Sequence, residues 1–262
     1  MSRELWDLSG RVALVTGAGS PTGIGFASAR ALGAKGARLV LTSTTERIFE
    51  RVSDLAAEGI EARALVGDLT QSHVSRDLVE LAASTWGRLD VLVHNAGMTS
   101  ISDPGLSTGS LEDLDEHLWR AGIARNLDTA FYIARAALPV IAEGGGGSAV
   151  FVTSVTGPVM AMRNEPIYAA AKAGLVGLVR SLALDYAARA ITVNAVAPGW
   201  IATGSQTAHE ARQGLASPLG RSGSADEIAA AITFLASPGA AYVTGQCLVV
   251  DGGNSIAEER AN

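Results

Sequence analysis

A tyrosine and a lysine stand four residues apart, at Tyr168 and Lys172, in a stretch rich in small apolar residues. In a helix this spacing puts two side chains on one face, about one turn apart. A free tyrosine has a pKa of about 10, and a nearby ammonium favours the phenolate. The pair therefore predicts a general acid and base at Tyr168, supported by Lys172.

The choice of lysine at this position is unusual for this chain. Of its 20 Lys and Arg residues, only Lys35 and Lys172 are lysines. An arginine would keep the charge, but it would not supply a compact ammonium with three rotatable donors. We therefore interpret Lys172 as a functional residue rather than a surface charge.

A second group of residues has the composition of a phosphate-binding turn. The segment 16–25 reads Thr-Gly-Ala-Gly-Ser-Pro-Thr-Gly-Ile-Gly, and it follows a short apolar run and precedes a helical pattern. Glycines let a backbone approach a pyrophosphate, whose charge is then met by the N–H groups at the helix start. The segment predicts a dinucleotide site with contacts from Gly17, Ser20, Thr22, Gly23, Ile24 and Gly25.

Alternating strands and helices must position these residues. Short runs of Val, Leu and Ile predict strands over 12–16, 39–42, 64–66, 91–94, 149–153, 192–197 and 247–250. Helical patterns between them cover 23–35, 46–58, 72–86, 112–142, 167–189 and 225–236. This alternation predicts an α/β, Rossmann-type fold, in which helices cover both faces of a doubly wound parallel sheet of about seven strands, in a single domain over 1–262.

Composition argues against several classes of function. The net charge is −6, and no Lys/Arg block is present that would bind nucleic acid or an anionic membrane. No apolar run reaches the roughly 18 residues of a membrane span, and the start of the chain is charged, so we expect a cytoplasmic protein. The single cysteine, Cys247, and four scattered histidines predict no metal site.

The glycine segment and the Tyr–Lys pair together resemble the short-chain dehydrogenase/reductase family, over about residues 8–253. The family pattern Thr-Gly-x3-Gly-x-Gly is similar to Thr16, Gly17, Gly23 and Gly25, but here two extra residues separate the first two glycines, so the loop should bulge. The resemblance implies a nicotinamide-dependent oxidoreductase that interconverts a ketone and a secondary alcohol of a small-molecule substrate.

The resemblance also implies roles for other residues. Ser154 ends a strand 14 positions before Tyr168 and would hold the substrate oxygen, while Thr153 should point to the other side of the strand. Asn126 would hold a water between Lys172 and solvent. The cofactor would also meet Tyr168, Lys172 and a set contributed by three strand ends, namely Asp68, Leu69, Asn95, Ala96, Gly97, Pro198, Gly199, Ile201 and Thr203.

His94 departs from the family pattern, because it replaces the first residue of an Asn-Asn-Ala-Gly turn. We interpret it as a packed residue at a strand end rather than a catalyst.

The end of the second predicted strand bears on the choice of cofactor. NAD-specific relatives usually carry an acid there, whereas this chain has Ser43 and Thr44, with Arg47 close enough to reach a 2′-phosphate. We therefore predict a preference for NADP(H), with NAD(H) as the alternative. A plain turn over 43–45 with a solvated Arg47 would leave the choice open.

The segments 218–221 and 244–253 resemble 3-oxoacyl-carrier-protein reductases, which implies a 3-oxoacyl thioester substrate and a homotetramer. A sugar, polyol or cyclic alcohol is the alternative substrate. Enoyl-thioester reductases also have a stretched glycine loop, but they space their tyrosine and lysine seven apart. A nucleotide-sensing scaffold without turnover is the alternative of another class, and it is disfavoured because all four catalytic positions are kept.

Overall fold

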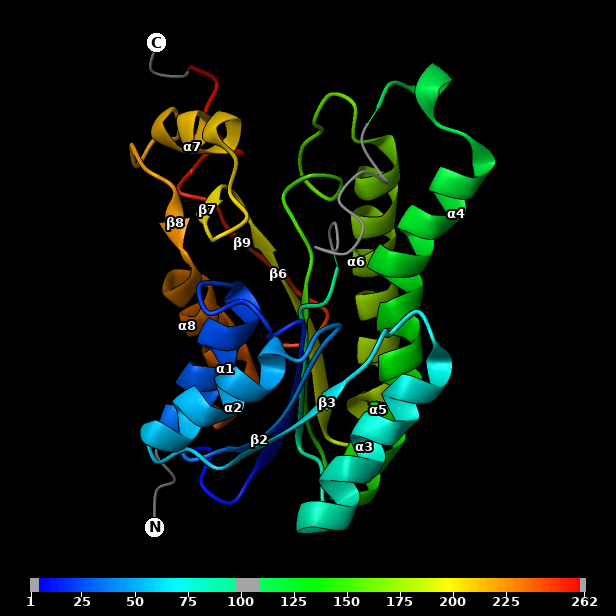
Figure 1. The fold of residues 1–262 in the computed structure, drawn as a ribbon, viewed down its shortest axis with the longest axis vertical. Coiled ribbons are helices and arrows are strands. Elements are labelled where there is room, and N and C mark those ends of the chain that lie inside the picture. The colour runs from blue at the N-terminus through cyan, green and yellow to red at the C-terminus, as the bar shows by residue number, and fades with distance from the viewer. Residues whose placement is uncertain (1–4, 98–108, 260–262) are drawn as a thin grey trace.

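Seven parallel strands form one sheet in the computed structural model, which describes residues 5–97 and 109–259 (Figure 1). The spatial order is β3-β2-β1-β4-β5-β6-β9. The bounds are β1 (Val12–Thr16), β2 (Arg38–Ser43), β3 (Ala62–Val66), β4 (Val91–His94), β5 (Gly147–Val152), β6 (Ile191–Pro198) and β9 (Cys247–Val250). The predicted doubly wound sheet is confirmed.

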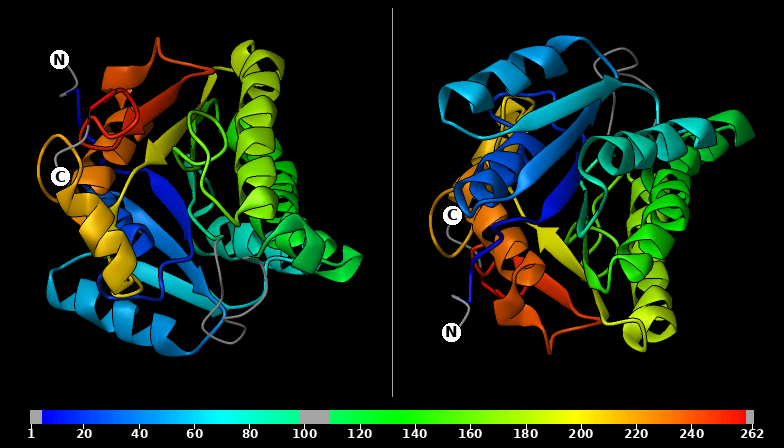
Figure 2. Two further views of the ribbon diagram at one scale, coloured as in Figure 1. Left: turned by 90° about the horizontal axis from the view of Figure 1, so that it is seen from above. Right: turned by 90° about the horizontal axis from the view of Figure 1, so that it is seen from below.

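Helices cover both faces of this sheet (Figures 1 and 2). One layer contains α1 (Ile24–Ala34), α2 (Arg47–Ala57) and α8 (Ala225–Ala236), and the other contains α3 (Ser72–Trp86), α5 (Thr129–Glu143) and α6 (Pro166–Ala187). Successive strand residues point to opposite faces. In β1, Ala13 and Val15 therefore pack into the first layer, while Val12 and Leu14 pack into the second.

The prediction of one helix over 112–142 is wrong. A 3₁₀ turn η1 (Leu111–Asp113) comes first, followed by α4 (Glu116–Ile123), a π-helical turn η2 (Ala124–Asp128) and then α5. The π turn adds a residue to the helical repeat, and this change leaves no trace in the apolar pattern.

A small outlying unit near the C-terminus was also not predicted. It contains β7 (Ile201–Ala202), which pairs with β8 (Gly223–Ser224), and the helix α7 (Ala208–Leu215); a 3₁₀ turn η3 (Pro238–Ala240) follows α8. Two-residue strands are too short to show a period. A signal for α7 was present, because Thr207 and Glu210 have the spacing of a capping box and form one.

Among the described residues, one helix, α6, is long and apolar enough to cross a membrane by length and composition. The sequence criterion of an uninterrupted apolar run did not detect it. In the structure, Leu175, Val179 and Ala183 of α6 belong to the core against the sheet. A helix in a protein core and a helix in a membrane both have apolar surroundings, so both are rich in apolar residues.

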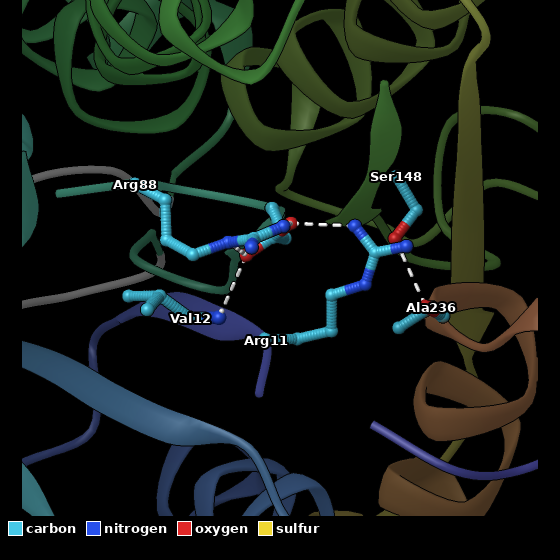
Figure 3. Close-up of polar contacts among 6 residues, drawn as sticks. Arg11, Val12, Arg88, Ser148 and Ala236 are labelled. Atoms are coloured by element: carbon cyan, nitrogen blue, oxygen red, sulfur yellow. Dashed lines mark hydrogen bonds and ion pairs between the residues drawn. The ribbon is translucent and has the colours of Figure 1, made fainter. Parts of the chain in front are cut away.

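A charge cluster lies at the amino edge of the sheet, where Arg11, Val12 and Arg88 converge (Figure 3). At its centre is Asp90, which is buried. Its carboxylate accepts hydrogen bonds from Arg11 at 2.6 Å, from Arg88 at 2.6 and 2.8 Å, and from the Val12 N–H at 2.9 Å. A cavity of about 660 Å³ opens beside Arg11 and Asp90. This cluster ties the start of β1 to the start of β4, at the edge opposite the predicted catalytic residues.

Candidate active site

The carboxyl ends of β1 and β4 meet at Thr16. Its hydroxyl accepts from the backbone N–H groups of Asn95 and Ala96, each at 3.1 Å, and lies 3.0 Å from His94 Nδ1. The Asn95 amide donates to the Gly17 carbonyl at 3.0 Å. The turn over 94–97 is therefore fastened to the start of the glycine segment.

The glycine segment allows backbone to come close to backbone. Gly17 has a φ of +68°, and a Cβ there would lie 2.9 Å from the Ala96 nitrogen. Gly23 is the N-cap residue of α1 and makes no side-chain cap, and the first turn of α1 has no acidic residue. The N–H groups and positive dipole end of α1 are therefore suited to an anion such as a pyrophosphate.

The two extra residues of this loop bulge outward, as the family pattern predicted. The Gly23 N–H donates to the Ser20 carbonyl at 3.2 Å, so 20–23 forms a turn whose tip is exposed. At this tip the Thr22 hydroxyl accepts from the Gly204 N–H at 2.9 Å. The enlarged loop thus contacts the segment that follows β7.

Ser43 and Arg47 flank the glycine segment at the end of β2. A Cβ on Gly19 would lie 2.7 Å from Ser43 Cβ and 3.9 Å from an Arg47 terminal nitrogen. The Ser43 hydroxyl donates to the Thr45 carbonyl at 2.7 Å, and Arg47 Nε donates to the Thr45 hydroxyl at 3.2 Å, while Thr44 is exposed. Within residues 5–97 and 109–259, Arg47 makes no ion pair.

Two of the predicted cofactor residues have structural contacts at the end of β3. Asp68 Oδ1 accepts from the Thr70 N–H at 2.9 Å, which is a turn cap. The Leu69 side chain is buried in the core with α3. Leu69 therefore offers a ligand only its backbone.

Tyr168 and Lys172 lie in the first two turns of α6, one above the other. The Lys172 ammonium nitrogen is 5.6 Å from the centre of the Tyr168 ring and donates to the Val152 carbonyl at 3.1 Å. Ser154 is near enough to the phenol to lower its pKa. The Thr153 hydroxyl instead donates to the Lys172 carbonyl at 2.9 Å, which is part of the backbone of the same helix.

Asn126 joins this group from the π turn η2. It is buried, and its amide donates to the Gly122 carbonyl at 3.2 Å. A Cβ on Gly97 would lie 3.1 Å from both Asn126 Oδ1 and Lys172 Nζ. The ends of these two side chains therefore meet beside the turn that follows β4.

The segment after β6 borders the same site. The Pro198 carbonyl accepts from the Val155 N–H at 3.0 Å, next to Ser154. A Cβ on Gly199 would lie 2.6 Å from Asp251 Cβ. Ile201 is in β7 and packs against the core, and the Thr203 hydroxyl lies 3.0 Å from that of Ser205.

Burial controls the ionisation of this site. Burial raises the pKa of Tyr168 to about 12, although the Ser154 hydrogen bond lowers it and the charges of Glu165 and Glu210 raise it further. Burial lowers the pKa of Lys172 to about 8. The chain's own groups therefore keep the phenol protonated at neutral pH, and the lowering of its pKa by Lys172 together with the positive charge of a bound nicotinamide stays a prediction.

Glu165 was missed by the sequence reasoning. It is half-buried at the start of α6, where burial and then the charge of Glu210 raise its pKa to about 7. Its position just before Pro166, at the start of the helix with Tyr168, was the available signal.

Comparison with known proteins gives a family match over nearly the whole chain. Residues 17–255 match a family model described as enoyl-(acyl carrier protein) reductase. The 3-oxoacyl-[acyl-carrier-protein] reductase FabG of Escherichia coli K12 is 38% identical over 251 residues, which cover 94% of this chain and 98% of that protein. The cis-4-hydroxycyclohexanecarboxylate dehydrogenase of Sinomonas cyclohexanicum is 39% identical over 247 residues, 93% of this chain and 96% of its own.

Solved structures agree with the observed fold. A dehydrogenase/reductase from Sinorhizobium meliloti 1021 superposes with a TM-score of 0.87 at 30% identity, covering 95% of this chain and 97% of its own. A structure from Burkholderia xenovorans gives a TM-score of 0.89 at 34% identity, with 96% and 99% covered.

Proposed function

The chain belongs to the short-chain dehydrogenase/reductase family and is an oxidoreductase that acts on a CH–OH or keto group, and we propose that it reduces the ketone of a 3-oxoacyl thioester with Tyr168 as proton donor. One observation carries the proposal: the Lys172 ammonium nitrogen lies 5.6 Å from the centre of the Tyr168 ring on one face of α6, with Ser154 near enough to the phenol to lower its pKa. This arrangement supports proton transfer to a carbonyl oxygen held between the two hydroxyls.

Each of these residues has a distinct role in the proposed reaction. A nicotinamide bound at this site would supply the hydride for the carbonyl carbon. Ser154 accepts from the Thr156 N–H at 3.1 Å, which leaves its own proton available for the substrate oxygen. Tyr168 then protonates that oxygen. Lys172 stabilises the resulting phenolate by its charge, and Asn126 holds a water that connects Lys172 to solvent.

The glycine segment supports the proposed cofactor site, because a side chain at Gly17 would overlap backbone and the start of α1 has no acid. We assign the pyrophosphate to the start of α1 and the nicotinamide to the edge near Tyr168. The proposed contacts remain those of the resemblance, from Gly17, Ser20, Thr22, Gly23, Ile24, Gly25, Ser43, Thr44, Arg47, Asp68, Leu69, Asn95, Ala96, Gly97, Pro198, Gly199, Ile201 and Thr203.

We propose that NADP(H) is the preferred cofactor. Arg47 lies beside Ser43 and the glycine segment, and no acid takes the place of Ser43. Ser43→Asp should shift the preference toward NAD(H) through repulsion of a 2′-phosphate, on the order of 1 to 3 kcal/mol. The ratio of kcat/KM for NADPH and NADH measures this shift. A wild-type ratio at least about tenfold in favour of NADH would overturn the assignment.

Two alternative substrates have specific support. The description of the matching family model names an enoyl reductase, and one relative acts on a hydroxycyclohexanecarboxylate. The four-residue spacing of Tyr168 and Lys172, with Ser154 on the phenol, favours a ketone over an enoyl thioester.

A substrate panel read by nicotinamide absorbance tests this choice directly. It contains acetoacetyl and crotonyl thioesters of N-acetylcysteamine, which differ in the reducible group, and 4-oxocyclohexanecarboxylate. We expect the acetoacetyl thioester to give the highest kcat/KM. A higher value for the crotonyl thioester would replace the proposal with enoyl reduction, and a higher value for the cyclic ketone would replace the substrate class.

We also propose that the enzyme works as a cytoplasmic homotetramer.

A further inference from the structure

His94 stands at the centre of a buried hydrogen-bond chain. Its ring is buried at the end of β4, with Nδ1 3.0 Å from the Thr16 hydroxyl and Nε2 3.4 Å from the Thr129 hydroxyl. The Thr129 hydroxyl in turn donates to the Arg125 carbonyl at 2.9 Å. These contacts connect the turn beside the glycine segment with the π turn η2.

The other hydrogen bonds made by Thr16 and Thr129 determine which atom donates the proton in each of their bonds to His94. The Thr16 hydroxyl already accepts from the N–H groups of Asn95 and Ala96, so its one proton is available for His94 Nδ1. His94 then carries its proton on Nε2 and donates it to Thr129. Burial, followed by the charge of Lys172, lowers the pKa of His94 to about 3, so the ring is neutral.

Thr129 has a particular place in the π turn. Its N–H bonds to the carbonyl of Ala124, five residues back, instead of the Arg125 carbonyl that an α-helix would use. Its hydroxyl takes the Arg125 carbonyl in that place. The Thr129 side chain therefore stabilises the change from the α-helical to the π-helical repeat. This change directs the side chain of Asn126 toward Gly97 and Lys172.

We propose that His94 is a positioning residue, which in its neutral Nε2–H form joins Thr16 to Thr129 and thereby holds the π turn that presents Asn126 to Lys172. The proposal rests on the role of Asn126 given under the proposed function. A residue that only packs would need the volume of the ring. The role proposed for His94 also needs its hydrogen bonds to Thr16 and Thr129.

The tautomer can be measured without any assay of function. Long-range ¹H–¹⁵N spectra of the whole enzyme contain signals from only four histidines, and His94→Asn identifies the one that is lost. We expect His94 to be neutral at pH 7 with its proton on Nε2. A proton on Nδ1, or a charged ring at pH 7, would overturn the proposal.

Paired substitutions at Thr129 test whether its hydrogen bonds affect the rate of hydride transfer. Thr129→Val keeps the shape but removes both hydrogen bonds, while Thr129→Ser keeps the hydroxyl. We expect Thr129→Val to slow single-turnover hydride transfer to acetoacetyl-N-acetylcysteamine about tenfold, with the cofactor Kd within about twofold of wild type. Thr129→Ser should stay within about twofold in both. Equal rates for Thr129→Val and Thr129→Ser would contradict the proposal.

A double substitution shows whether the effect passes through Asn126. In an Asn126→Ala background, Thr129→Val should add less than about a twofold loss, because the residue it positions is already absent. A full tenfold further loss would contradict the proposal. If the wild-type enzyme does not reduce the thioester, the proposed substrate is wrong. The hydride-transfer rates of the Thr129 variants are then measured with a ketone that the enzyme does reduce. The tautomer of His94 is tested by the spectra in either case.

Discussion

At the level of single residues, the surroundings of Tyr168, the proton donor proposed here, keep its phenol protonated. Burial raises its pKa to about 12, and the charges of Glu165 and Glu210 add to this. The phenol is therefore protonated at neutral pH in the chain itself, which suits reduction. Oxidation would require the phenolate, and the positive charge of an oxidised nicotinamide would have to favour it.

Removing the phenolic oxygen tests the assigned chemistry. Tyr168→Phe should lower kcat by at least about a thousandfold and leave the cofactor Kd within a few-fold, because only the proton donor is lost. Lys172→Ala should damage both quantities. Steady-state rates and fluorescence titration with NADPH measure them. Retention of about a tenth of the wild-type rate, with chemistry rate-limiting, would show that another group donates the proton.

Glu165 should shape the pH profile of the reverse reaction. Its charge raises the pKa of Tyr168, so Glu165→Gln should lower that pKa and move the alkaline rise of alcohol oxidation to lower pH. Glu165 has a pKa of about 7, so the variant and wild type should converge below that pH and diverge above it. Rate profiles from pH 5 to 10 measure this, with Glu80→Gln on α3 as control. Superimposable profiles would mean that Glu165 does not act on the phenol.

At the level of elements, the enlarged glycine loop contacts a segment far away in the sequence. Thr22 and Gly204 are 182 positions apart, and their hydrogen bond joins the turn before α1 to the segment between β7 and α7. Both segments carry residues assigned to the cofactor site, namely Thr22 and Thr203. The contact should therefore slow the departure of a bound cofactor.

Two substitutions at Thr22 measure the contribution of this contact. Thr22→Val removes the hydrogen bond, worth about 0.5–1.5 kcal/mol, so the cofactor should dissociate roughly two- to tenfold faster. Thr22→Ser keeps the hydroxyl and should behave as wild type. Stopped-flow displacement of NADPH gives the rate. Equal dissociation rates for the two variants would show that the contact does not restrain the cofactor.

At the level of the whole molecule, hydrogen bonds to Asp90 hold together the edge of the sheet that lies away from the site, where Arg11, Val12 and Arg88 converge (Figure 3). Burial alone would raise the pKa of Asp90, but the hydrogen bonds from Arg88, Arg11 and the Val12 N–H hold it below its usual value. A carboxyl with a lowered pKa stabilises the fold above its unfolded pKa, near 4, and this contribution is lost as the pH falls through the folded value.

Asp90→Asn should therefore destabilise the protein mainly at neutral pH. We expect a loss of about 3 kcal/mol in the free energy of unfolding at pH 7, since two arginines lose their partner. The difference from wild type should shrink as the pH falls below about 4. Urea unfolding at fixed protein concentration measures it, with the exposed Asp77→Asn on α3 as control. A difference independent of pH would mean that the charge of Asp90 is not the stabilising feature.

Exposed apolar side chains on α5 and α6 predict the assembly. Phe131 is 47% exposed and Leu184 is 81% exposed on these neighbouring helices. We expect a homotetramer with two-fold axes that bury this face. Light scattering at micromolar concentration should give four times the chain mass of 26.8 kDa for wild type.

A matched pair of substitutions locates the interface. Phe131→Glu should reduce the assembly, whereas Phe49→Glu, at a phenylalanine that is 50% exposed on α2, should leave it intact. A monomer mass for the wild type would refute the tetramer. Equal masses for the two variants would place the contact elsewhere.

The sequence by itself determined the sheet and the parts of the site that depend on local spacing. The limits of β1, β4, β9, α3 and α8 follow the apolar pattern, because a strand or helix buried on a sheet needs apolar residues at its own period. Tyr168 and Lys172 share a face of α6 for an equally local reason, since the helix repeat brings positions four apart together.

The tertiary structure decided what depends on contacts between distant segments. The π turn at Asn126 depends on a hydroxyl at Thr129 and a neutral ring at His94, and no period in the sequence encodes such a relation. The pKa of Tyr168 in the chain itself depends on burial and on the charges of Glu165 and Glu210, which the spacing of Tyr168 and Lys172 in the sequence does not report. Burial and through-space charge are properties of the packed chain, and they exist only once β4, η2 and α6 lie together.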